Sequence, residues 1–185
     1  MRIIVDWTVI DSAKSANAFA NALTRNPPRT ARRTAIADAI NFAVPFFEKN
    51  DIEGTRRVVD ISGDGPNNWG GRVTSARDAA VAAGVTINGL PIINNRPSPF
   101  GGAPFRNRDL YYRDCVIGGP GAFIVVANSF QDFARAVRKK LILEIAGLTP
   151  IDPVRAGSRR PPFQRVVDRR VPPCDAGERR LRGDD

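Results

Sequence analysis

The sequence predicts an α/β fold built on a mostly parallel, doubly wound sheet. Short apolar runs rich in β-branched residues alternate along the chain with segments whose apolar residues recur every three or four positions, as in successive βα units. Of the 185 residues, 42% are hydrophobic and 25% are charged, which is ordinary for a soluble domain large enough to bury a core. We therefore expect one domain, residues 1–148, followed by a tail.

The first half of the chain begins with a predicted β–α pair. Residues 3–10 (IIVDWTVI) have the character of a strand, and Ser12 can cap a following helix with one apolar face. A second helix is expected from Thr34, with Pro45 kinking or ending it. Residues 56–62 are the next predicted strand, because they are apolar, β-branched and followed by glycines.

The second half continues the alternation. A helix is predicted from about residue 71 to 84, a strand at 85–92, a helical turn at 109–114 and a strand at 122–127. A last helix is expected at 129–147, where Ser129 to Asp132 resembles a capping box. The inward face predicted for this helix consists of Phe130, Phe133, Val137, Leu141 and Ile145.

The most informative stretch is VVDISGDGPNN at residues 58–68, where a strand breaks into a polar, glycine-rich loop. In open α/β sheets, ligands bind at the carboxyl ends of strands, so Asp64 is a candidate ligand-binding residue. The neighbouring residues could support the loop, with amides that hold the turn or supply oxygens. The same composition also suits a strand-to-helix turn that binds nothing. The candidate support residues are Ser62, Gly63, Gly65, Asn67 and Asn68.

Four motifs together resemble an uncharacterised bacterial family, the DUF1194 family of von Willebrand factor A-like domains. They are the stretch at 58–68, INGL at 87–90, YY at 111–112 and VIGGPGAF at 116–123. The resemblance covers roughly residues 3–147. It implies a three-layer α/β/α fold with a von Willebrand factor A-like, Rossmann-like sheet.

The resemblance also implies a metal site. Von Willebrand factor A domains bind Mg²⁺ through an Asp-x-Ser-x-Ser loop, a Thr from a second loop and an Asp from a third. By resemblance, Thr34 matches the second loop and Asp64 the third, although Thr34 could equally be a helix N-cap. The first loop has no match, since the two Ser of residues 11–15 lie three places apart, whereas the motif has them two places apart. With two ligands, we expect Mg²⁺ binding to be weak or absent.

The missing loop leads to an expectation about the chain itself. Relative to the family, it lacks the first strand, the first helix and the second strand, through either a real deletion or a wrong start site. Residues 1–6 do not form a signal peptide, so the chain as written is cytoplasmic; a true start upstream would make it periplasmic or secreted. No apolar run reaches the ~20 residues needed to span a membrane.

The function expected from these features is that of a protein-interaction module with an unknown protein partner and no enzymatic activity. The chain has no histidine, and no nucleophile–base pair is evident. Its net charge of +9 comes from scattered basic residues, so no nucleic-acid binding is expected. One alternative is a mis-started or relic fragment that binds no ligand. Another is a fragment of a phosphate- or nucleotide-binding α/β enzyme, although the glycines at 63 and 65 fit neither phosphate-binding fingerprint.

The remaining expectations concern the tail and the cysteines. Residues 149–185 contain six prolines and nine arginines with almost no apolar periodicity, which predicts a disordered tail. The two cysteines, Cys115 and Cys174, do not form a metal-ligand spacing. Cys115 is expected to be a small buried residue with a structural role.

Overall fold

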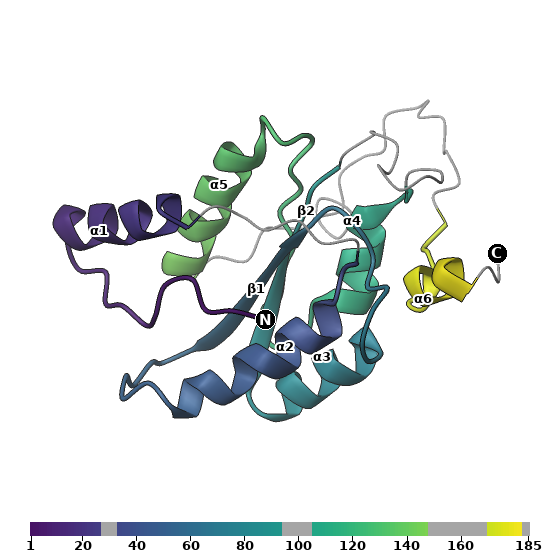
Figure 1. Cartoon of the computed structure of the whole chain (residues 1–185), viewed down its shortest axis with the longest axis horizontal. Helices are drawn as coiled ribbons and strands as arrows, with labels where there is room; N and C mark the ends of the chain where they lie inside the picture. Colours follow the sequence, from purple (N-terminus) through teal and green to yellow (C-terminus); the bar gives the residue numbers. More distant parts are fainter. Residues whose placement is uncertain (27–32, 94–104, 148–169, 183–185) are drawn as a thin grey trace, which may run out of the picture.

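A parallel pair of strands lies at the centre of the described part of the chain (Figure 1). The structure is a computed structural model that describes residues 1–26, 33–93, 105–147 and 170–182. Strand β1 (Arg57–Gly63) pairs with β2 (Val85–Pro91) in a register that sets Arg57 opposite Val85 and Gly63 opposite Pro91. Both strands end at the same edge of the sheet. The predicted mixed α/β character is confirmed.

A third extended segment lies alongside β2. Parallel bridges join Gly89 to Ile124 and Ile92 to Ala127, and the Val125 amide donates to the Gly89 carbonyl at 3.0 Å. The strand predicted at 122–127 is therefore present as a paired segment, but with isolated bridges in place of a continuous ladder.

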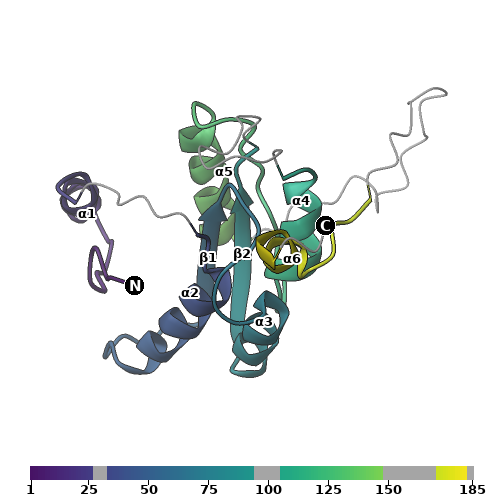
Figure 2. The same ribbon diagram turned by 45° about the vertical axis from the view of Figure 1, so that its right-hand side comes forward.

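Two helices cover one face of the sheet. They are α2 (Ile36–Ala43) and α3 (Val73–Ala82), which lie side by side in Figures 1 and 2. Because alternate residues of a strand face opposite sides, Val59 and Ile61 point to these helices while Asp60 lies on the opposite side. The shared core contains Ile36, Ile40, Val59, Ile61, Val73, Ala76, Ala80, Val85 and Ile87.

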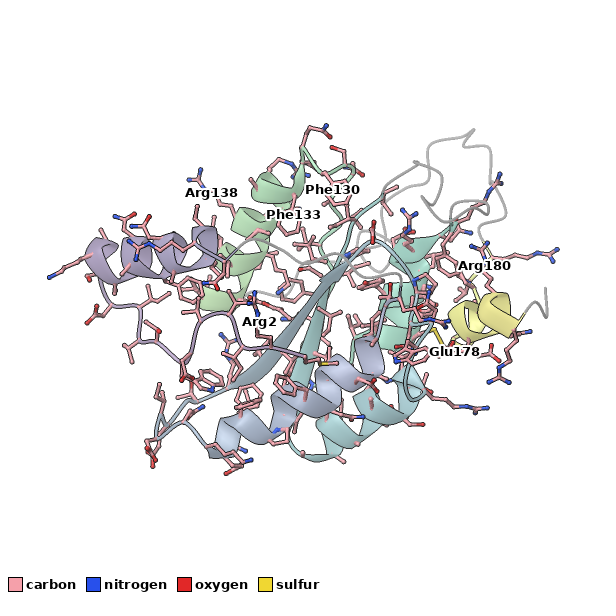
Figure 3. The ribbon with its side chains drawn as sticks, in the orientation of Figure 1. Arg2, Phe130, Phe133, Arg138, Glu178 and Arg180 are labelled. Atoms are coloured by element: carbon pink, nitrogen blue, oxygen red, sulfur yellow. A yellow bond between two sulfur atoms is a disulfide. The ribbon has the colours of Figure 1, made fainter. Side chains whose placement is uncertain are left out.

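Helix α5 (Phe133–Ile145) packs on the other face, in an orientation that the sequence did not predict. Its buried residues are Ala136 and Lys140, whereas Ile145 is 83% exposed. The predicted inward face is wrong for Phe130, Leu141 and Ile145, which are all exposed. Phe133 and Val137 are half-buried against a second core cluster. Figure 3 shows Phe130, Phe133 and Arg138 on this part of the chain.

Lys140 occupies the inward side of α5 because it meets two carboxylates there. Its side chain is 4% exposed, and its ammonium forms ion pairs with Asp60 of β1 and, at 2.5 Å, with Glu144 one turn further along α5. The Asn88 amide donates to Glu144 at 2.6 Å. The Nζ of Lys140 also lies 5.8 Å from the centre of the Phe123 ring. A buried charge is tolerated only when it is paired in this way.

The two carboxylates share one ammonium, and their pKa values move in opposite directions. Burial raises the pKa of Asp60 to about 6, although Lys140 acts to lower it. Burial also acts to raise the pKa of Glu144, but hydrogen bonds from Lys140 and Asn88 outweigh it and lower that pKa. Glu144 is therefore the better stabilised of the two anions.

A pH-dependent stability difference is expected between the wild type and Asp60→Asn. Because the pKa of Asp60 is higher in the folded state than its ordinary value of 3.8, its contribution to stability is fully present below that ordinary value. It is lost as pH rises through the raised pKa. The free energy of unfolding of Asp60→Asn should therefore improve relative to wild type between about pH 4 and about pH 7. Urea denaturation across this range measures the difference, and a difference that does not vary with pH would contradict the expectation.

The N-terminal part of the chain differs from prediction. Residues 3–10 form no strand, and large apolar side chains such as Trp7 and Val9 remain exposed. The following helix, α1 (Ala13–Thr24), is present and begins with the predicted cap, since Ser12 forms a capping box with Ser15. No residue of α1 is buried. An apolar, β-branched run becomes a strand only where a neighbouring strand pairs with it, and none does so here among the described residues.

Shorter elements complete the described part. The 3₁₀-helix η1 (Val44–Glu48) follows α2 directly, as expected from Pro45, and α4 (Arg108–Tyr111) continues into the π-helix η2 (Tyr112–Val116), where a helical turn was predicted. Most of the predicted loop at 94–108 lies outside the described residues. Among the described residues, no helix has both the length and the apolarity required to cross a bilayer.

The expected disordered tail is not what the structure describes at 170–182. This part contains helix α6 (Ala176–Arg182), which lies beside α4 in Figures 1 and 2. The rest of the expected tail, residues 149–169 and 183–185, lies outside the described residues. Composition predicted disorder because the segment has little apolar surface, but covalent and polar contacts described below hold it in place.

Candidate functional site

The loop that follows β1, residues 63–68, is called the Asp64 loop below, and it lies directly against Thr34. The Asn68 amide donates to the Thr34 carbonyl at 2.9 Å, and the Thr34 amide donates to Asn68 Oδ1 at 2.7 Å. A Cβ built on Gly65 would lie 3.4 Å from Thr34 Oγ1. The structure thus brings together the two segments in which the sequence placed candidate ligand residues.

Asn67 is the centre of the hydrogen-bond network that shapes this loop. It is fully buried, its Oδ1 accepts from the Ala37 amide at 3.0 Å, and its Nδ2 donates to the Gly71 carbonyl at 3.0 Å. Its backbone amide donates to the Tyr111 hydroxyl at 3.1 Å. Asn67 therefore joins the start of α2, the following loop and α4. The side chains of Asn67 and Asn68 thus connect the Asp64 loop to Ala37 and Thr34.

Gly63 is required by the close approach of Tyr112. A Cβ at this position would lie 2.6 Å from the Tyr112 hydroxyl, so any larger side chain would displace the ring or the strand end. Tyr112 is fully buried, and within the described part of the chain its hydroxyl has no hydrogen-bond partner. Burial raises the pKa of Tyr112 well above its ordinary value, with Tyr111 and Asp64 adding to the rise. Tyr112 is therefore neutral at physiological pH.

Asp64 lies at the exposed top of the loop, near a buried cation. Its carboxylate acts to raise the pKa of Arg108, whereas burial of the guanidinium has the larger effect and lowers it. Arg108 is 5% exposed, and its Nη1 donates to the Ile92 carbonyl at the end of β2 at 3.2 Å. Ser62 is exposed on the preceding strand position. The edge of the sheet thus presents one exposed carboxylate above a buried arginine and tyrosine.

Helix α6 covers part of the Asp64 loop. Glu178 Oε1 accepts from Asn67 Nδ2 at 2.7 Å, and Figure 3 shows Glu178 on the side of α6 that faces the body of the protein. Gly177 is buried against the Asn67 carbonyl, where any Cβ would collide with that oxygen. The guanidinium of Arg180 lies 5.2 Å from the centre of the Phe105 ring. The sequence analysis missed these residues, because a seven-residue helix in a proline- and arginine-rich segment carries no periodic signal.

A disulfide between Cys115 and Cys174 ties α6 to η2, across a sequence separation of 59 residues. Cys115 is fully buried, which confirms its structural role, but it is not the unpaired small residue that was expected. Two cysteines in a chain are a signal for such a bond, although spacing alone does not establish it. The Cys174 carbonyl also accepts from the Tyr111 hydroxyl at 3.5 Å.

The metal ligands named from the sequence are Asp64 and Thr34. Asp64 offers a carboxylate and Thr34 a hydroxyl, and no group of three or more Asp, Glu, Cys or His side chains among the described residues could hold an ion. Mg²⁺ needs near-octahedral oxygen ligands, and two protein ligands leave most positions to water. The donor set does not fit a tightly bound Mg²⁺.

The comparisons with known proteins place the chain in a family but do not give it an activity. No curated protein and no solved structure matches the chain. A family model described as a protein of unknown function (DUF1194) matches residues 1–149, which is most of the chain and includes all four motifs named above. The chain therefore belongs to the DUF1194 family.

Proposed function

We propose that this protein is a protein-interaction module with a von Willebrand factor A-like architecture and no enzymatic activity. Its ligand surface would be the sheet edge formed by the Asp64 loop and Thr34. The contact between these two segments carries the proposal, because binding surfaces of open α/β sheets lie at the carboxyl ends of their strands. In this proposal the described strands are one part of a doubly wound sheet, with α2 and α3 on one side and α5 on the other.

An exposed aromatic residue beside the loop supports a protein partner. Trp69 follows the Asp64 loop directly and is 53% exposed, and the guanidinium of Arg33 lies 4.5 Å from its ring centre. Trp and Arg are the residue types that contribute most to the binding energy of protein interfaces. A solvent-exposed Trp stacked with an Arg, next to an exposed carboxylate, suits a partner with both apolar and charged groups.

The two tryptophans of the chain provide a matched test of this surface. Full-length protein is immobilised, and proteins retained from a lysate of the source cells are quantified by mass spectrometry. A specific partner should be retained by the wild type and by Trp7→Ala, which changes an exposed Trp in the N-terminal segment. The same partner should be lost with Trp69→Ala and reduced with Asp64→Asn. Equal retention by all four proteins would show that the interaction surface is not here.

Mg²⁺ should have little effect on the stability of the protein. With Asp64 and Thr34 as the available ligands, we expect a dissociation constant in the millimolar range or weaker, equivalent to about 4 kcal/mol of binding free energy or less. Thermal melts with and without millimolar Mg²⁺ should differ little, and Asp64→Ala should behave as the wild type does, since a ligand stabilises a fold only when a site binds it. Micromolar Mg²⁺ affinity that is lost in Asp64→Ala would mean that other residues complete the site.

A further inference from the structure

The C-terminal helix lies on the loop that we propose as the ligand surface. Gly177 and Glu178 contact Asn67, and the preceding Cys174 is bonded to Cys115 beneath. These residues come from a part of the chain that is outside the matched family region of 1–149. A segment beyond that region therefore covers a loop inside it.

We propose that α6 is a removable cover of the Asp64 loop, locked by the Cys115–Cys174 disulfide and released when that bond is reduced. Reduction by a dithiol transfers two electrons and two protons, which leaves two cysteine thiols while the dithiol becomes a disulfide. The inference rests on the proposed function in one respect, namely that the uncovered loop is the surface a partner binds.

The contacts of α6 are suited to release once the covalent bond is broken. The helix has seven residues, too few to be stable on its own. Among the side chains that the structure describes in this segment, Asp175, Arg179 and Arg180 are exposed, and Gly177 has no side chain to bury. Short elements with few buried apolar contacts open at low free-energy cost.

The contact made by Glu178 shows what the cover does to the loop. Its Oε1 accepts a hydrogen bond from one of the two N–H groups of Asn67 Nδ2, and its Oε2 is buried without a hydrogen-bond partner within the described part of the chain. A buried carboxylate oxygen without a partner weakens the binding of α6 to the loop, because the loss of its hydration is not compensated by a hydrogen bond. The same amide proton becomes available to an acidic group of a partner when α6 leaves. The cover therefore occupies, with its own carboxylate, a hydrogen-bonding position of the loop.

Hydrogen exchange of the full chain tests the cover directly. Amides of residues 67–71 should exchange roughly tenfold faster or more after reduction of the disulfide, and likewise in Cys174→Ser. Gly177→Leu should give the same increase with the disulfide intact, because its side chain cannot fit against the Asn67 carbonyl. Arg182→Leu, on the same helix at an exposed position, is the matched control and should behave as the wild type does. Amides of β2 should be unchanged in every sample.

The outcomes separate the cover from the proposed function. Unchanged exchange at 67–71 after reduction and in Gly177→Leu would overturn the cover, as would an equal rise in β2, which would indicate general loosening. If exchange rises and the reduced protein retains more of the partner lost with Trp69→Ala, both proposals are supported. If exchange rises while retention stays constant, the cover stands and the partner surface lies elsewhere.

Discussion

Replacing Lys140 by Met is expected to lower the free energy of unfolding by about 3 kcal/mol, the low end of the range for a buried ion pair, because the Asp60 side chain is 39% exposed. The substitution keeps the length of the side chain but removes the ammonium that pairs with Asp60 and Glu144. Two carboxylates would then face each other at a site where Lys140 itself is 4% exposed, and a buried charge without its partner is costly. Chemical denaturation at neutral pH measures the loss.

Lys139→Met is the matched control for this prediction, because Lys139 is the preceding residue of α5 and is exposed. Its effect should stay within about 0.5 kcal/mol. The loss in Lys140→Met should also shrink when Glu144→Gln is added, since one of the unpaired carboxylates is then gone. A loss below about 1 kcal/mol in Lys140→Met would show that water reaches the two carboxylates and that the cluster is not buried in solution.

Asn67→Ala is expected to destabilise the protein by about 3 kcal/mol. The change removes the acceptor of the Ala37 amide and the donor to the Gly71 carbonyl and Glu178. Because Ala37 is fully buried, its amide would be left without a partner unless water enters, and each unsatisfied buried group costs about 1–3 kcal/mol. Thermal and urea denaturation should give the same ranking of variants.

Asn17→Ala, on the exposed surface of α1, provides the comparison and should be close to neutral. Asn67→Asp separates the acceptor role of the side chain from its donor role. It keeps an oxygen for the Ala37 amide but places a second carboxylate against Glu178. That variant should be destabilised at neutral pH and recover as pH falls, when one carboxyl group becomes protonated. If Asn67→Ala is as stable as wild type, the loop does not depend on this amide network.

Local sequence signals predicted most of the elements near the sheet. The run at 58–62 followed by glycines gave β1 and its turn, and Pro45 marked the end of α2, because each signal depends on the backbone preferences of a few residues. The prediction of a strand at 3–10 is wrong because it depended on more than local preferences. Its pattern describes side chains that suit a strand, but a strand exists only with a paired neighbour.

The orientation of α5 shows the limit of hydrophobic periodicity. Spacing placed Phe133, Val137 and Leu141 on one inward line. The structure leaves Phe133 and Val137 half-buried, exposes Leu141, and buries Ala136 and Lys140. Besides an apolar cluster, the buried face of α5 meets an ion-pair cluster with Asp60, which is 80 residues away in sequence and on another element. A pattern of hydrophobicity along one helix contains no information about such a partner.

The candidate site was predictable only in part. Asp64 was named from its place at the end of a strand, Thr34 from a resemblance, and the amides at 67 and 68 from turn chemistry. The structure places the loop that carries Asp64 against Thr34. Whether a metal or a partner binds there stays a prediction. The contribution of α6 could not be inferred, since it depends on a covalent bond between residues that are far apart in sequence.

The disulfide has a practical consequence for where the folding unit ends. A protein cut after residue 149, at the limit of the matched family region, would keep Cys115 but lose Cys174. It would then carry an unpaired thiol, and the Asn67 amide would have lost its acidic partner. Such a shortened chain could join a second copy through Cys115 and be mistaken for a natural dimer. The matched family region therefore ends before the cysteine to which its own Cys115 is bonded.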